Sequence, residues 1–301
     1  MPNLGMLRQR LPLPRIAGSL SLLLSLCLSP GWADAVRAKT PETAPAELKQ
    51  VLSQIEAAAN RHNIEGIMQF YGSDFTSSSG LSRSELSRAL TQLWERYPEL
   101  NYRTELQSWD TAGDEIVAET VTYITGSRQS EGRTIKLQST LRSRQRLQGQ
   151  EIVQRQVLAE RTKLTSGSNP PEVRVRIPEK VRPGERFNFD VIATEPLGED
   201  VLLGTALEQP VTGDRYLKPS KLDLEVLPAG GIYRIGEAPA SPGNRWLSAV
   251  LVRENGITAV TQRLRVVEGS ATSTPLPSSS QRYLFSPTVR AGTVVLRRCN
   301  L

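Results

Sequence analysis

The spacing of apolar residues changes at Pro98, and this change limits the folds that the chain can adopt. Before Pro98, apolar residues recur every three or four positions, as in a helix with one buried face. After Pro98 they alternate with polar residues, which is typical of a strand with one buried face. Helices followed by an antiparallel meander form the α+β class. The pattern predicts helices near 46–59, 63–71 and 82–98, and strands near 101–110, 114–126, 133–147 and 150–164.

Local signals mark the starts of two of these helices. Asn63 has the side chain of a typical N-cap, because its oxygen can accept a hydrogen bond from a free backbone N–H of the first turn. Ser82 and Glu85 have the spacing of a capping box, in which each side chain bonds the backbone N–H of the other residue. Both helices are therefore expected to begin at these residues.

Two stretches carry a resemblance to a known family. They read NIEGIMQFYGSDF over 63–75 and SRSELSRALTQLWERYP over 82–98, and the expected meander follows. Over about residues 46–165, the chain resembles the nuclear transport factor 2-like family, which includes ketosteroid isomerase. The resemblance implies an α+β cone-shaped roll, with three helices on a curved antiparallel sheet and often a pocket between them. Because this fold carries both enzymes and binding modules, it implies neither function by itself.

The isomerases in this family raise the question of a catalytic pocket. They use a pocket carboxylate as the base, and tyrosine or protonated aspartate side chains hold the oxyanion. Asp74 and Glu105 are the acids that could face inward here, but no spacing matches the catalytic positions of the enzymes. We expect no catalytic residue, and a ligand pocket lined by Tyr71, Asp74, Tyr97, Tyr102 and Tyr123.

The composition argues against a metal or a cofactor. His62, the only histidine, follows the first helix and is expected to cap it or to meet solvent. One histidine and two cysteines cannot supply the usual zinc ligand sets. The isolated glycines lie in turns and form no phosphate-binding loop. We therefore expect neither a metal site nor a cofactor.

The last two strands of the meander are rich in basic residues. Residues 128–163 contain nine Lys or Arg and three Glu. Arg142, Arg144 and Arg146 alternate, so an extended strand places all three on one face. Two interpretations stay open: a solvated outer face whose charges deter aggregation, or a partner-binding face for an unknown protein or an anionic surface. Loss of residues 1–35 would leave a net charge of +4, too little to suggest nucleic acid.

A second, all-β domain is expected over 171–269, after a linker of composition TSGSNPP at 165–171. Seven short alternating segments separated by turn residues suggest an immunoglobulin-like β-sandwich. Asn255 and Gly256 give a strong hairpin signal, and Trp246 is expected to fill the central core. The stretch PEKVRPGERFNFDVIA (178–193) resembles the opening strands of bacterial immunoglobulin-like modules.

As a pair, the two domains resemble exported cyanobacterial proteins of no known activity. The stretches that carry this resemblance are FNFDVIATEPLGEDVLLGTALEQPV (187–211) and RWLSAVLVRENGITAVTQRLRVV (245–267). The remaining residues, 270–301, are expected to form a disordered tail with short strand-like pieces.

Residues 1–35 have the pattern of a cleavable signal peptide. Three arginines precede a ten-residue apolar run at 19–28, which is too short to span a bilayer as a helix. Ala33-Asp34-Ala35 supplies the small residues that a signal peptidase reads. The mature chain is expected to begin at Val36, in the periplasm, the thylakoid lumen or the cell exterior, and to retain only Cys299 of the two cysteines.

These observations favour a non-enzymatic binding or scaffolding protein that uses the roll pocket or the basic sheet face. The alternative is an isomerase- or cyclase-like enzyme that uses the same pocket. A homodimer formed through the sheet is a further expectation. A buried carboxylate beside a tyrosine hydroxyl would favour the enzyme, and a pocket filled by side chains would favour the binding module.

Overall fold

The computed structural model describes residues 38–269 except 131, 197, 199, 217–221 and 228. The segment expected to be a signal peptide, 1–35, and the expected tail, 270–301, lie outside these residues. In the described part of the chain, no helix is long and apolar enough to cross a bilayer.

The helices begin where the sequence predicts. The Ser82 hydroxyl accepts a hydrogen bond from the Glu85 N–H at 3.3 Å, and the Glu85 carboxylate accepts from the Ser82 N–H at 2.9 Å. The Asn63 side chain accepts from the Gly66 N–H at 2.9 Å. The helical elements are η1 (Pro41–Thr43), α1 (Ala46–Asn60), α2 (Ile64–Met68) and α3 (Arg83–Arg96).

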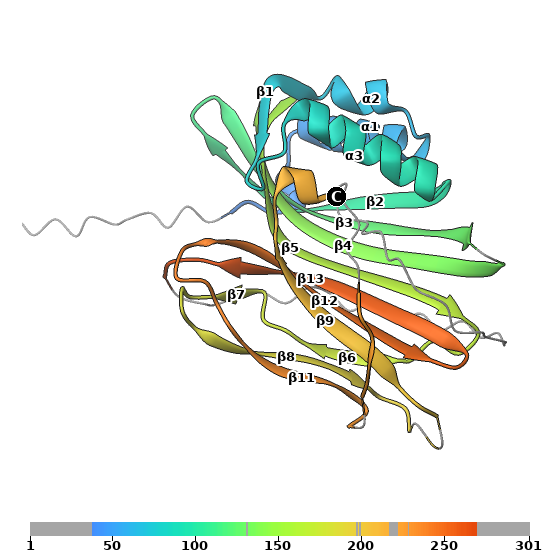
Figure 1. Cartoon of the computed structure of the whole chain (residues 1–301). Helices are drawn as coiled ribbons and strands as arrows, with labels where there is room; N and C mark the ends of the chain where they lie inside the picture. The colour runs from blue at the N-terminus through green and yellow to red at the C-terminus, as the bar shows by residue number, and fades with distance from the viewer. Residues whose placement is uncertain are drawn as a thin grey trace, which may run out of the picture. The chain divides into compact units, whose positions relative to one another are not determined.

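The strands form two sheets (Figure 1). The larger has ten strands, with the central order β10-β9-β12-β13-β5-β4-β3-β2, while β1 pairs with β5 and β7 pairs with β13. The smaller has the order β11-β8-β6. The strands are β1 (Tyr71–Ser77), β2 (Glu99–Ala112), β3 (Glu115–Ser130), β4 (Arg133–Gln148), β5 (Glu151–Gly167), β6 (Val173–Arg176), β7 (Lys180–Val181), β8 (Arg186–Ala193), β9 (Leu203–Pro210), β10 (Glu225–Val226), β11 (Gly231–Glu237), β12 (Gly243–Arg253) and β13 (Gly256–Val266), with η2 (Gly213–Tyr216) between β9 and β10.

The expected fold class, an α+β roll plus an all-β immunoglobulin-like sandwich, is wrong. The described part of the chain is mostly antiparallel sheet, and one ten-stranded sheet runs through both of its parts. Its continuity comes from β5, which pairs with β4 along one edge and with β13 along the other, from Gly167↔Gly256 to Arg161↔Gln262. Residues 165–167, expected in a linker, lie in β5, because the free edge of that strand accepts a second partner. We call residues 38–167 the helix-covered region and residues 168–269 the two-sheet region.

Each region has its own apolar core. In the helix-covered region, α1, α2 and α3 pack against β2 to β5, with Leu48, Leu90 and Leu137 in a shared core. In the two-sheet region, the inner face of β8 packs against β12 and β13, with Phe189, Leu247 and Leu264 in a second core. Because side chains alternate along a strand, residues of β12 and β13 between those of the second core point to the opposite face of the large sheet.

The outer edge of β2 is covered. The Asn60 amide donates to the Tyr102 carbonyl at 2.9 Å and accepts from the Tyr102 N–H at 2.7 Å. The Glu56 carboxylate accepts from the Thr104 N–H. Further along, Lys39 exchanges two backbone hydrogen bonds with Trp109. The chain therefore satisfies this strand edge itself, which protects it from pairing with another molecule.

A buried ion pair joins the two regions across the β5–β13 seam. Arg263 on β13 is 0% exposed and donates to the Glu160 carboxylate on β5 from Nε at 3.0 Å and from Nη2 at 2.7 Å. The Trp246 indole on β12 donates to the same oxygen at 3.2 Å. Trp246 is fully buried, but it packs with Leu81 and Val211 and lies outside the two-sheet core that we expected it to fill.

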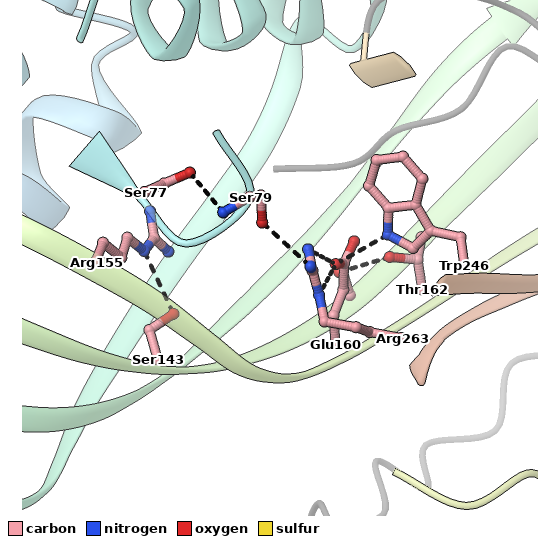
Figure 2. A network of polar contacts seen from close by, with 9 residues as sticks. Ser77, Ser79, Ser143, Arg155, Glu160, Thr162, Trp246 and Arg263 are labelled. Atoms are coloured by element: carbon pink, nitrogen blue, oxygen red, sulfur yellow. Dashed lines mark hydrogen bonds and ion pairs between the residues drawn. The ribbon is translucent and has the colours of Figure 1, made fainter. Parts of the chain in front are cut away.

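The loop between β1 and α3 covers this pair. Arg263 Nη1 donates to the Ser79 hydroxyl at 3.2 Å, and the backbone N–H of Ser79 donates to the Ser77 hydroxyl at 3.2 Å (Figure 2). The cluster therefore draws residues from β5, β12 and β13 and from the loop that precedes α3. Removing one partner of a buried ion pair of this kind strongly destabilises the folded protein.

We expect the Glu160–Arg263 pair to be a main determinant of stability. Glu160→Gln should lower the free energy of unfolding by about 3 kcal/mol, because it leaves the Arg263 charge buried without its counter-charge. Arg263→Met should have a similar effect for the converse reason. In a double-mutant cycle by urea unfolding, the double variant should lose about 2 kcal/mol less than the sum of the single losses.

Glu119 and Arg144 form a matched control, since they are also a cross-strand Glu–Arg pair but are half or partly exposed. The same cycle on Glu119→Gln and Arg144→Met should give a coupling below about 1 kcal/mol. Equal couplings at the two pairs would contradict the structural role assigned to Glu160 and Arg263.

Candidate functional site

Two of the expected pocket residues lie in the core under the helices. Tyr97 is 1% exposed and Tyr102 is also buried. The Tyr102 hydroxyl accepts a hydrogen bond from the Trp94 indole of α3 at 3.0 Å. The His62 ring stacks on Trp94, with centroids 5.0 Å apart, and His62 itself has a left-handed backbone at φ 53°. The Trp94 ring therefore links His62 and Tyr102, and the Trp94 indole and the Tyr102 hydroxyl bond each other within the core.

Tyr71 also lies in this core, at the start of β1. Its ring meets Phe75 edge to face, with centroids 4.9 Å apart. Its backbone carbonyl accepts from Arg83 Nε at 3.0 Å, and a second nitrogen of Arg83 donates to the Met68 carbonyl. The arginine at the first position of α3 therefore fixes the turn between α2 and β1, and Tyr71 has a packing role.

Asp74 points away from the core. It is exposed on β1, next to exposed Ser73 and buried Phe75, and accepts a hydrogen bond from the Ser73 hydroxyl at 3.3 Å. A carboxylate in this position is hydrated, and it cannot act on a group held under the helices.

Tyr123 lies on the other face of the sheet. Its neighbour Ile124 belongs to the core under the helices, so the alternation of β3 points Tyr123 outward. The Arg103 guanidinium carbon lies 4.3 Å from the centre of the Tyr123 ring, and Arg103 also pairs with Glu105. Partial burial and the nearby Glu105 carboxylate raise the pKa of Tyr123. This is an exposed cluster on the outer sheet face, separate from the core.

The structure thus brings Tyr71, Tyr97 and Tyr102 into one core and places Asp74 and Tyr123 outside it. In the part of the chain that the structure describes, no group of three His, Cys, Asp or Glu side chains could hold a metal ion. The arrangement offers a packed aromatic interior and polar clusters on the outer surface.

The three basic residues of β4 share a face, as predicted, but they have different environments. Arg144 donates to Glu119, the residue directly opposite on β3, from Nε at 2.9 Å. Arg146 donates to Glu115 from Nε at 2.8 Å. Arg144 and Arg146 remain 50% and 47% exposed at their side chains. Cross-strand acids therefore balance both charges while leaving the guanidinium groups within reach of solvent.

Arg142 belongs to an internal contact between the two regions. It pairs with Glu179, in the turn between β6 and β7, at 3.3 Å, and the two side chains are 13% and 7% exposed. Nearby, Arg161 on β5 donates to the side-chain oxygen Oε1 of Gln262 at 2.7 Å, and the side-chain nitrogen Nε2 of Gln262 donates to the Ile177 carbonyl at 2.7 Å. Burial lowers the pKa of Arg161. The face that carries Arg142 is thus partly covered by the two-sheet region.

The sequence interpretation missed Glu160, Arg263 and Ser79. A weak signal for Glu160 was present, because Leu158, Glu160, Thr162 and Leu164 share one face and a charge interrupts an otherwise apolar and hydroxyl-bearing series. Alternation alone cannot reveal its partner, which follows 103 residues later. The partner became apparent only from the pairing of β5 with β13.

The comparisons with known proteins match parts of the chain. Residues 168–267 match the model of a domain of unknown function, DUF8623. No curated protein matches the chain.

Several solved structures are similar to part of the chain. One is a hypothetical protein with a ketosteroid isomerase-like fold from Catenulispora acidiphila, in complex with trimethylamine, at 17% identity and a TM-score of 0.26, over 40% of this chain and 85% of that one. An NTF2-like protein of unknown function from Cytophaga hutchinsonii has 12% identity and a TM-score of 0.23, over 38% and 91%. Bd1075 from Bdellovibrio bacteriovorus has 13% identity and a TM-score of 0.26, over 37% and 40%, so the chain spans less than half of that protein.

The first two of these structures bear the fold names of the family that residues 46–165 resemble. The likeness covers about two fifths of the chain. The comparisons do not show the immunoglobulin-like or the cyanobacterial resemblance.

Proposed function

We propose that this chain is an exported, non-enzymatic binding or scaffolding protein. The observation that carries the proposal is the buried aromatic cluster of the helix-covered region. Tyr97, Tyr102 and Trp94 are buried there in one core, with Trp94 bonded to Tyr102, and Asp74 lies on the outside. An isomerase-like or cyclase-like site needs a carboxylate beside a hydroxyl donor in a pocket with room for a substrate. The packed rings support the binding interpretation over the enzyme.

The outer face of β3 and β4 is the proposed contact surface for an anionic partner. Arg144 and Arg146 are half exposed there, and their pairs with Glu119 and Glu115 are surface ion pairs. Such pairs contribute about 0–1 kcal/mol, so a phosphate or carboxylate of a partner can compete with them at little cost. Arg142 is excluded from this surface, since it is paired inside the protein.

The arginines should separate into two classes when each is changed to glutamine. Arg142→Gln should lower the free energy of unfolding by about 3 kcal/mol, because it removes a paired charge from beside the buried Glu179 carboxylate, which also interacts with Arg161. The double change Arg144→Gln and Arg146→Gln should alter it by about 1 kcal/mol or less. Urea unfolding followed by circular dichroism would measure both.

The same variants test the contact surface. Capture of the protein on vesicles containing phosphatidylserine should weaken in the Arg144→Gln and Arg146→Gln variant, and should weaken with salt, because exposed charges are screened over about 8–10 Å at physiological ionic strength. A matched control, Glu119→Gln with Glu115→Gln, removes the competing acids and should strengthen capture. If neither change alters capture, these arginines only form a hydrated outer face of the sheet and do not bind a partner.

Export is proposed from the pattern of residues 1–35. The mature chain should begin at Val36 and carry no lipid, because Leu26 occupies the position where a lipidation signal places a small residue before Cys27. Intact-mass measurement of protein from an envelope fraction would check both points. Retention of Met1, or an acylated Cys27, would contradict the proposal.

Changes at Asp74 and His62, whose side chains are of types common at catalytic sites, should abolish no activity. Asp74→Ala removes an exposed carboxylate and should leave stability almost unchanged. His62→Ala removes a ring that stacks on Trp94 and should lower stability modestly, by about 1 kcal/mol. An isomerase or hydrolase activity of the unaltered protein that either change abolished would overturn the non-enzymatic proposal.

A further inference from the structure

Large exposed apolar side chains gather at one side of the two-sheet region. Among the described residues, Val201, Val226, Tyr233 and Ile235 are 53–65% exposed. Val226 lies on β10, next to the start of β9, where Val201 precedes the strand. Arg234 on β11 connects the two sheets here, since it bonds the Ala206 carbonyl of β9 and the Glu225 carboxylate of β10. Apolar groups collected at one place on a surface indicate an interaction site.

β11 is an edge strand, and its backbone hydrogen-bonding groups point alternately toward β8 and toward the outer edge of the sheet. The Ala193 N–H donates to the Gly230 carbonyl, and the Ala238 N–H donates to the Glu185 carbonyl. Because bonded and non-bonded pairs alternate in an antiparallel ladder, residues 232, 234 and 236 bond β8. The backbone groups of residues 231, 233, 235 and 237 therefore point to the outer edge, beside which no strand lies in the described part of the chain.

This edge differs from the edge of β2. At β2, Asn60, Glu56 and Lys39 satisfy the outward backbone groups. At β11, Tyr233 and Ile235 combine outward backbone groups with exposed apolar side chains, and the edge has no proline or bulge between Gly231 and Glu237. Proteins usually block such an edge unless it is used for pairing.

We propose that β11 pairs with β11 of a second copy, antiparallel and about a two-fold axis at Arg234. In this register Tyr233 lies opposite Ile235 of the second copy, and Gly231 lies opposite Glu237. Every residue with outward backbone groups then meets another such residue, so the two three-stranded sheets join into one of six strands. The two Tyr–Ile pairs lie on the exposed face, where directly opposite aromatic and β-branched side chains stabilise a sheet.

Charge and symmetry favour a second copy over an unrelated strand. Arg234 meets its symmetry mate at the axis, but each Arg234 is paired with its own Glu225 at 3.2 Å, so the axis carries no net charge. A two-fold contact is closed, and it uses both open edges without leaving a new one for further growth. This contact surface is separate from Arg144 and Arg146 and does not depend on the proposed function.

A single cysteine on the axis tests the register. In a Cys27→Ser, Cys299→Ser background, Arg234→Cys places two thiols on residues whose Cα atoms lie about 4.5 Å apart, within the range of a disulfide. Mild oxidation should then give a covalent dimer. The matched control Glu237→Cys lies opposite Gly231 of the second copy and about 20 Å from its own symmetry mate, so it should stay monomeric on a denaturing gel. Equal cross-linking of both variants, or of neither, would overturn the register.

Sedimentation equilibrium of the purified full chain tests the contact itself. The unaltered protein should sediment at twice the mass of one chain. The double change Tyr233→Lys and Ile235→Lys places like charges opposite each other twice and should weaken dimerisation about tenfold or more. The matched control Val201→Lys and Val226→Lys adds the same charge beside β11 and should change dimerisation by less than about threefold. A monomer at all concentrations, or equal weakening by both double variants, would overturn the proposal.

Discussion

Glu160 and Arg263 carry opposite charges in the interior of one sheet, where neither can be hydrated. Glu160 lies on the strand that closes the helix-covered region, and Arg263 lies on β13 of the two-sheet region. Removing either side chain would leave the other charge buried without its partner, which costs several kcal/mol. The Ser79 loop and Trp246 also bond this pair, so the start of α3, the seam and β12 depend on the same few atoms.

The seam makes the large sheet continuous and determines which surfaces remain available. One face of β2 to β5 is covered by the helices, and part of the other face is occupied by the turn that carries Glu179. The edge of β2 is covered by α1 and by the first described residues. Among the described residues, the outer face around Arg144 and Arg146 and the outer edge of β11 are the two surfaces that we propose for partners.

The arginines of β4 show how one sequence pattern can have several outcomes. Alternation placed all three on one face, because side chains alternate along a strand. Their environments then depend on which residues lie nearby. Glu119 and Glu115 on β3 pair with two of them at the surface, and Glu179 of the two-sheet region pairs with the third in a buried contact. Only the pairing of strands distant in sequence separates a surface ion pair worth little from a buried one whose loss is costly.

Local chemistry in the sequence by itself determined the helix starts and the change to strands after Pro98. The caps at Asn63 and Ser82 depend on residues within one turn, and alternation depends on neighbours two apart. The tertiary structure decided that β5 pairs with β13, that Asp74 and Tyr123 lie outside the aromatic core, and that Glu160 meets Arg263. These outcomes depend on contacts between residues far apart in the chain, such as the 103 positions that separate Glu160 from Arg263. The sequence does not show which strand edge is left free, because the backbone N–H and C=O groups are the same in every residue except proline.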